Sequence, residues 1–151
     1  MRAFLLPSVA LLTWILAAQG AAAAEPPPIG QVKVVSGEAR ALRAGRQLAL
    51  RPGTPLAERD VVETGANSAV GMTFVDGSRL SLGPRSRLDL AEFSFREPGE
   101  EDEFEAALAR GSLAASSGAI VQGRPGAMRI QTPTTILGVR GTEFVVRVAS
   151  P

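Results

Sequence analysis

The side chains that could carry out catalysis are few in this sequence. Its 151 residues include no His, no Cys and no Tyr, so the candidate acids and bases are carboxylates and Lys33. A Ser–Lys pair would require Lys33 to be desolvated beside a serine. Lys33 instead lies where apolar and polar residues alternate, as in a strand with one solvent-facing side. We therefore predict that the protein is not an enzyme.

The acidic segment 97–105 (EPGEEDEFE) offers oxygen ligands of the kind that Ca²⁺ prefers. It lacks the alternating D-x-[DN]-x-[DN]-G order of a calcium-binding loop, and its charges cluster without intervening turns. We predict that this segment is a solvated surface loop, and we expect neither a metal site nor a cofactor.

Four arginines, Arg79, Arg85, Arg87 and Arg140, are candidates for a basic patch that binds an acidic ligand or peptidoglycan carboxylates. Such a patch forms only if the strands that carry them are neighbours. Without Arg2, the chain has as many basic as acidic residues. This neutrality argues against nucleic acid or an anionic membrane surface as the main partner.

The N-terminus has the pattern of an export signal. Arg2 precedes an apolar run that ends before Ala22-Ala23-Ala24, an A-x-A cleavage site. We predict a signal peptide over residues 1–24 and a Pro-rich lead over 25–29, with the mature protein periplasmic or secreted. An uncleaved membrane anchor is the alternative, but the run is short for a bilayer span. After cleavage no integral membrane anchor is expected.

The stretch around Asp76-Gly77 predicts a β-hairpin. Apolar residues recur at every second position on both sides of it, at Val70, Met72 and Phe74 and then at Leu80 and Leu82. A two-residue loop would mix apolar and polar side chains on both faces. A three-residue loop, Val75-Asp76-Gly77, pairs Met72 with Leu80 and leaves one face apolar. It also puts Gly77 at the left-handed position that such loops need, so we predict this register.

Short strands separated by turns continue through the rest of the chain. We expect Val32 and Val34 on one face of the first strand, Leu42 as the main apolar residue of the second, and a bulge or a crossing between sheets near Ala91. Residues 104–110 fit either a strand or one helical turn. The pattern predicts a single all-β domain over residues 30–148, an antiparallel β-sandwich or jelly roll (alternatively a β-roll), with a tail at 149–151.

The sequence resembles the FecR domain, named for the periplasmic part of iron-uptake transmembrane regulators. The matching pieces are Gly30-x-Val32 to Gly37, Gly53-x-x-Leu56, Asp60-x-Val62-x-Thr64-Gly65, Asn67-Ser68-Ala69, Phe74-x-Asp76-Gly77-Ser78, Leu80-x-Leu82-Gly83-Pro84-x-Ser86-x-Leu88, Gly111-x-Leu113, Thr132-Pro133 and Val139-Arg140-Gly141-Thr142-x-Phe144. Family regulators carry an anti-sigma region and a transmembrane helix before this domain. A signal peptide in their place indicates an isolated, exported FecR domain.

The resemblance assigns structural roles to the motif residues. These are Asp60, Thr64, Gly65, Asp76, Gly77, Ser78, Gly83, Pro84, Arg140, Gly141 and Thr142. In several FecR-type regulators the Gly–Thr bond of this motif resembles a self-cleavage site, at which the Thr hydroxyl attacks the preceding carbonyl. For Gly141-Thr142 we prefer the structural reading, in which the glycine permits a bend before a strand.

Together these features predict a non-catalytic binding or signalling module. By resemblance, its partner is another cell-envelope protein, engaged by turns or by an exposed edge strand. The alternatives are a structural envelope scaffold and a carbohydrate- or peptidoglycan-binding β-sandwich. The second of these is disfavoured by the low aromatic content of the chain.

Overall fold

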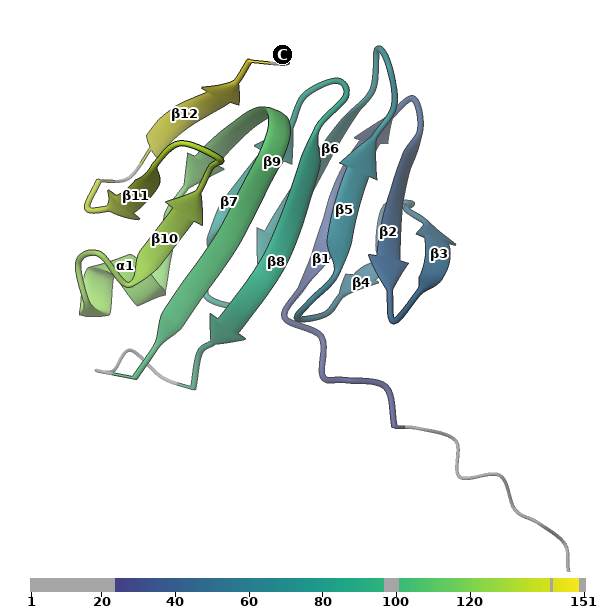
Figure 1. The fold of residues 1–151 in the computed structure, drawn as a ribbon. Coiled ribbons are helices and arrows are strands. Elements are labelled where there is room, and N and C mark those ends of the chain that lie inside the picture. Colours follow the sequence, from purple (N-terminus) through teal and green to yellow (C-terminus); the bar gives the residue numbers. More distant parts are fainter. Residues whose placement is uncertain (1–23, 97–100, 142, 150–151) are drawn as a thin grey trace, which may run out of the picture.

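The segments with alternating apolar and polar residues form strands along nearly the whole described chain (Figure 1). The structure is a computed structural model, and it describes residues 24–96, 101–141 and 143–149. The predicted signal peptide, except Ala24, lies outside the described residues. The elements are β1 (Gly30–Ser36), β2 (Ala39–Arg43), β3 (Arg46–Ala49), β4 (Pro55–Leu56), β5 (Val61–Thr64), β6 (Ala69–Phe74), β7 (Arg79–Leu82), β8 (Arg87–Ser94), β9 (Glu103–Ser116), α1 (Ala119–Gly123), β10 (Met128–Gln131), β11 (Ile136–Val139) and β12 (Glu143–Val148).

The long strand β9 joins two halves of one sheet. Its first part pairs with β8 and β10, in a front half ordered β3-β2-β5-β8-β9-β10-β11. Its last part pairs with β7 and β12, in a rear half ordered β4-β1-β6-β7-β9-β12. Gly111 lies between the two parts with φ +90°, a conformation that favours glycine. Among the described strands, every pairing is antiparallel except that of β9 with β10, which is parallel.

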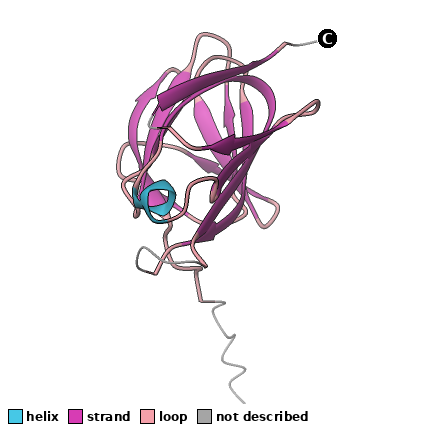
Figure 2. Cartoon of the chain, turned by 90° about the vertical axis from the view of Figure 1, so that its left-hand side faces the viewer, coloured by secondary structure: helices cyan, strands magenta, loops and turns pink. Residues whose placement is uncertain are grey.

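The predicted all-β fold is confirmed, as a sheet that curls around a single hydrophobic core (Figure 2). Three phenylalanines show how the halves meet inside it. Phe74 of β6 contacts Phe93 of β8 and Phe104 of β9, with ring centroids 5.8 and 4.7 Å away. Of the helices in the described part of the chain, none is long and apolar enough to cross a membrane.

The hairpin between β6 and β7 has the predicted register. Met72 pairs with Leu80 and Val70 with Leu82. The Phe74 N–H donates to the Ser78 carbonyl at 2.9 Å, which closes the three-residue loop. Gly77 has φ +85°, as this loop requires. The alternation of buried and exposed residues was therefore enough to fix the register.

Two predictions of which side chains are buried were wrong. Val32 is buried, but Val34 is 58% exposed, because a β-bulge at Lys33 turns the strand so that Val34 lies over Gly71 on the outer face. In β2 the core residue is Ala41, paired with Val62, while Leu42 is only partly buried.

The predicted irregularity near Ala91 is confirmed, because the pairing of β8 with β9 shifts between Asp89 and Glu92. Residues 104–110 form a strand within β9, which resolves the two alternatives left open by the sequence. The five-residue helix α1 follows β9.

The acidic segment differs from the predicted solvated loop. Asp102 is buried, and Glu103 and Glu105 belong to β9, where both accept hydrogen bonds from the Arg129 guanidinium of β10. Glu103 and Glu105 are therefore paired with a residue of the neighbouring strand β10, whereas the sequence predicted that they lie in solvent. Residues 97–100 of this segment lie outside the described residues.

Candidate functional site

Asp76 and Ser78 of the FecR-like motif are buried and fasten the hairpin to helix α1. The Asp76 carboxylate accepts from the Ser78 N–H at 3.0 Å and from its hydroxyl at 2.6 Å. The Ser78 hydroxyl oxygen in turn accepts from the Gly118 N–H at 2.9 Å, and the Asp76 carbonyl from the Ala119 N–H at 2.8 Å. The motif at this turn thus fixes the start of α1, 40 residues further along the chain.

Asp60 is fully buried just before β5, where it holds a neighbouring turn. Its carboxylate accepts from the Ala57 N–H at 2.9 Å and from Nε and Nη2 of Arg43 at 2.8 and 2.7 Å. The hydrogen bond with Asp60 raises the pKa of Arg43, although burial opposes it. This carboxylate is therefore occupied by contacts within the chain.

Thr64, Gly83 and Ser86 connect β5 to the turn between β7 and β8. The Thr64 hydroxyl donates to the Gly83 carbonyl at 2.6 Å and accepts from the Ser86 N–H at 2.9 Å. The Ser86 hydroxyl accepts from the Ser112 N–H at 3.0 Å, next to Gly111. A Cβ at Gly111 would lie 2.1 Å from the Ser86 Oγ, so the bend of β9 depends on this close approach.

Gly65 and Pro84 border the same region. The Gly65 N–H donates to the Glu38 carbonyl at 2.9 Å, and its carbonyl accepts from the Arg85 N–H at 3.0 Å. Pro84 is exposed in the turn between β7 and β8. Both residues lie in turns that join strands of the sheet.

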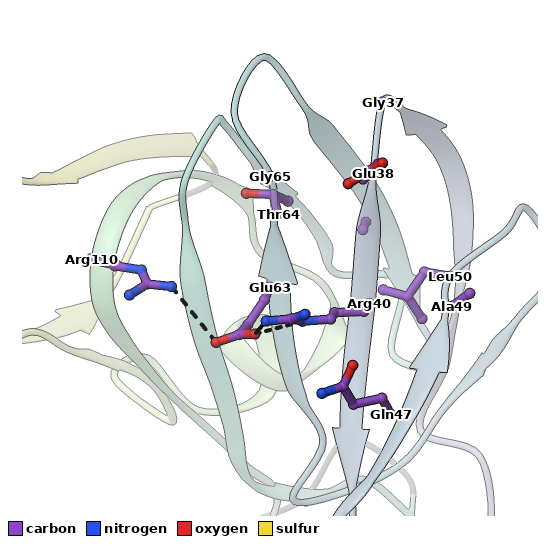
Figure 3. Close-up of a pocket in the computed structure, with 11 residues that line it drawn as sticks. Gly37, Glu38, Arg40, Gln47, Ala49, Leu50, Glu63, Thr64, Gly65 and Arg110 are labelled. Atoms are coloured by element: carbon purple, nitrogen blue, oxygen red, sulfur yellow. Dashed lines mark hydrogen bonds and ion pairs between the residues drawn. The ribbon is translucent and has the colours of Figure 1, made fainter.

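A hollow lies on the outer face of the front half, where Glu63 meets Arg40 and Arg110 (Figure 3). Cross-strand pairing sets out a row, with Arg40 of β2 opposite Glu63 of β5, Glu63 opposite Arg87 of β8, and Arg87 opposite Arg110 of β9. The hollow has a volume of about 650 Å³. Of this row, Arg40, Glu63 and Arg110 line the hollow, and its walls also include Gln47, Leu50 and Thr64.

The Glu63 side chain is 8% exposed because the arginines cover it. Its Oε2 accepts from Nε of Arg40 at 2.9 Å and forms an ion pair with Nη2 of Arg40 at 2.8 Å, and its Oε1 accepts from Nη1 of Arg87. Nη2 of Arg110 lies 3.7 Å from Oε1, which is an ion pair but too long for a hydrogen bond. The hydrogen bond from Arg40 lowers the pKa of Glu63; burial opposes this shift, and Arg87 adds to it.

The strands do not bring together the predicted basic patch of Arg79, Arg85, Arg87 and Arg140. Arg79 pairs with Ser116 in the rear half, whereas Arg87 pairs with Arg110 in the front half. Arg40 and Arg110, which together with Arg87 contact Glu63, were missed. Only the strand order brings these residues together, and neither residue carries a local signal in the sequence.

The edge of β12 is a second candidate binding surface. Among the described residues β12 pairs with β9 alone, so its other side carries no strand. Val145 is 73% exposed on this strand, and the apolar side chains of Ile136 and Leu137 are exposed on β11. A hollow of about 280 Å³ lies between these strands, lined by residues 137–141 and 143–146. Apolar side chains therefore gather next to an open edge.

Arg140 and Gly141 link β11 to β12, and both are exposed. The Ser117 hydroxyl donates to the Gly141 carbonyl at 2.7 Å. Among the described residues, no atom apart from those of the chain neighbours lies within 4 Å of a Cβ built on Gly141, and its φ is outside the left-handed region. Neither space nor this angle requires glycine here. Thr142, the other residue of the suspected cleavage site, lies outside the described residues.

Comparisons with known proteins give one match. The family model described as FecR protein matches residues 60–151, more than half of the chain. The motif pieces between Gly30 and Leu56 precede this range. Neither the curated proteins nor the solved structures include a match to the chain. The matched family is signalling-related and envelope-associated, and is not a known enzyme family. This chain belongs to the FecR family.

Proposed function

We propose that this protein is a non-catalytic signalling module of the periplasm that binds another cell-envelope protein. Membership of a signalling-related envelope family supports a protein partner. The N-terminal pattern with its A-x-A site at residues 22–24 supports export through a cleaved signal peptide. The polar motif residues at the turns, such as Asp60 and Asp76, are engaged within the chain and hold its strands together.

The observation that carries this proposal is the open edge of β12. An edge strand presents backbone N–H and C=O groups to which an extended segment of another protein can pair, and alternate side chains then supply specificity. Val145 offers an exposed apolar contact, and the charged Glu143 and Arg147 are exposed on the same strand. These charges would disfavour indiscriminate pairing of edges.

The other edge strands fit this role less well. β4 has two residues, and β3 and β11 have four each, whereas β12 has six. A longer edge offers more backbone hydrogen bonds to an added strand. We therefore place an extended segment of the partner protein along β12, beside the hollow that β11 helps to line.

Site-specific photo-crosslinking in cells tests this assignment. A photoreactive amino acid at position 145 is expected to capture a specific envelope protein, whereas the same group at Leu48 on β3 is not. Leu48 is the matched control, because it is an exposed apolar residue on another edge strand. Val145→Lys should reduce co-purification of that protein, and Leu48→Lys should leave co-purification unchanged.

Other results of the same experiment would contradict the proposal. Capture of a second copy of this chain from position 145 would indicate self-association. Equal capture from both positions would show that the edge of β12 has no special role. Retention of the protein on peptidoglycan with no protein partner would favour the carbohydrate-binding alternative.

Self-cleavage between Gly141 and Thr142 is a second candidate function. It is favoured by the hydrogen bond from Ser117 to the Gly141 carbonyl, which would stabilise negative charge on that oxygen. In this reaction the Thr142 hydroxyl oxygen attacks the Gly141 carbonyl carbon, the C–N bond breaks, and water hydrolyses the resulting ester. Intact-mass measurement separates the candidates. We expect one species at full mass, and two fragments abolished by Thr142→Val would establish self-cleavage.

A further inference from the structure

We propose that the hollow beside Glu63 binds a carboxylate group of an acidic ligand through the guanidinium groups of Arg110 and Arg40. This site is separate from the strand-binding edge, because it lies on the outer face of the front half and β12 belongs to the rear half. The inference therefore does not depend on the proposed function.

The charges around the Glu63 carboxylate are unbalanced. Three guanidinium groups surround the single carboxylate of Glu63. Arg87 and Arg110 are direct cross-strand neighbours, an arrangement of like charges that destabilises a sheet unless an anion offsets it. Glu38 also lines the hollow, but Figure 3 shows it at the rim beside Gly37, away from the guanidinium groups. A second carboxylate among the arginines would offset the remaining repulsion.

The arginines are not equally engaged by Glu63. Arg40 directs Nε and Nη2 at Oε2, and Arg87 directs Nη1 at Oε1, so Glu63 orients both groups. Arg110 is held only by the longer 3.7 Å ion pair, and its side chain is 54% exposed. A guanidinium group presents a planar fork of donors that matches a carboxylate. Arg110 therefore has donors available for an incoming anion, with Arg40 as its neighbour across Glu63.

The walls of the hollow suit a small organic acid better than a bare inorganic anion. Its volume of about 650 Å³ falls in the range of ligand pockets. Leu50 and Ala49 give it an apolar wall, and the Gln47 side chain gives it an amide (Figure 3). A carboxylate attached to a short carbon chain could contact both the arginines and this wall, as a glutamate side chain would.

Titration of the purified domain with glutarate, followed by NMR of the arginine Nε–H groups, tests the site. We expect saturable shifts of the Arg40 and Arg110 signals, with a dissociation constant on the order of 1 mM. The capped peptide Ac-Glu-Ala-Glu-NH₂ should shift the same signals if the source of the carboxylate is a peptide. Its Gln analogue, Ac-Gln-Ala-Gln-NH₂, should not shift them.

Two variants make the test specific. Arg110→Gln leaves the hydrogen bonds of Glu63 in place and should weaken glutarate binding about tenfold or more. Arg46→Gln, on the exposed strand β3, should leave binding unchanged. The absence of saturable shifts, equal binding by both variants, or tighter binding of inorganic phosphate than of glutarate would overturn the inference. Thermal melts of both variants establish that they are folded.

Discussion

At the scale of single residues, Glu63 connects stability to pH. The hydrogen bond from Arg40 lowers the pKa of Glu63. The contribution of Glu63 to folding stability is therefore fully present above the ordinary carboxylate pKa, and it is lost as pH falls through the lowered pKa. We expect Glu63→Gln to cost about 1–2 kcal/mol of unfolding free energy at pH 7, since the arginine partners are partly exposed.

Chemical denaturation over a pH series checks this prediction. The difference between wild type and Glu63→Gln should shrink as pH falls through the lowered pKa of Glu63, because the wild-type carboxylate then takes up a proton. Glu38→Gln is the matched control, because Glu38 lines the same hollow but is exposed. A difference that stays constant down to pH 2 would contradict the assigned role of Glu63.

Gly77 provides a second test at this scale. Its φ of +85° is strained for a β-branched residue, although no described atom beyond its chain neighbours lies within 4 Å of an added Cβ. We expect Gly77→Val to cost about 1–2 kcal/mol and to lower the melting temperature by several degrees. Gly77→Asn should lose much less stability than Gly77→Val, because Asn tolerates a positive φ. An unchanged melting temperature in Gly77→Val would mean that the loop does not need glycine.

At the scale of elements, helix α1 depends on its packing against the β6–β7 hairpin. A Cβ at Gly118 would lie 2.4 Å from the Asp76 carbonyl oxygen and 2.5 Å from the Ser78 nitrogen, and both are backbone atoms. We therefore expect Gly118→Ala to cost about 1–3 kcal/mol, measured by urea denaturation. Gly138→Ala is the control, because a Cβ there has no atom of the described structure within 4 Å apart from its chain neighbours. Equal stability of the two variants would show that α1 is not held by this contact.

Elements also show what sequence reasoning can reach in this fold. The register of the β6–β7 hairpin followed from alternation and one glycine, because both are local properties. The outward turn of Val34 could not be foreseen, since it arises from a bulge at Lys33 opposite β6. The arginine row was equally hidden, because Arg40, Glu63, Arg87 and Arg110 meet only once the strand order β2-β5-β8-β9 is known. Contacts between distant strands leave no periodic signal in the sequence.

At the scale of the whole molecule, export is part of the proposed function. We expect the protein produced with its N-terminal segment in a bacterial host to accumulate in the periplasm with Glu25 as its first residue, because cleavage would follow Ala24. N-terminal sequencing of the periplasmic fraction measures this. The double variant Ala22→Arg and Ala24→Arg should block signal-peptide cleavage, whereas Ala21→Arg should not. A wild-type protein that keeps Met1 in the membrane fraction would indicate an anchor instead.

The two proposed binding surfaces of this FecR-family chain lie on different halves of the curled sheet. Its front half carries the arginine row around Glu63 on its outer face, and its rear half ends in the open edge of β12. The two surfaces can therefore be altered separately. Arg110→Gln should leave capture at position 145 unchanged, and a change at position 145 should leave glutarate binding unchanged.

Hydrogen–deuterium exchange tests most directly whether β12 receives a strand from a partner. The measurement compares the free domain with its complex with the protein captured at position 145. We predict slower amide exchange over residues 143–148 in the complex, since the free edge becomes hydrogen-bonded, and unchanged exchange over the edge strand at residues 46–49. Unchanged exchange over 143–148, with protection elsewhere on the domain, would contradict the account.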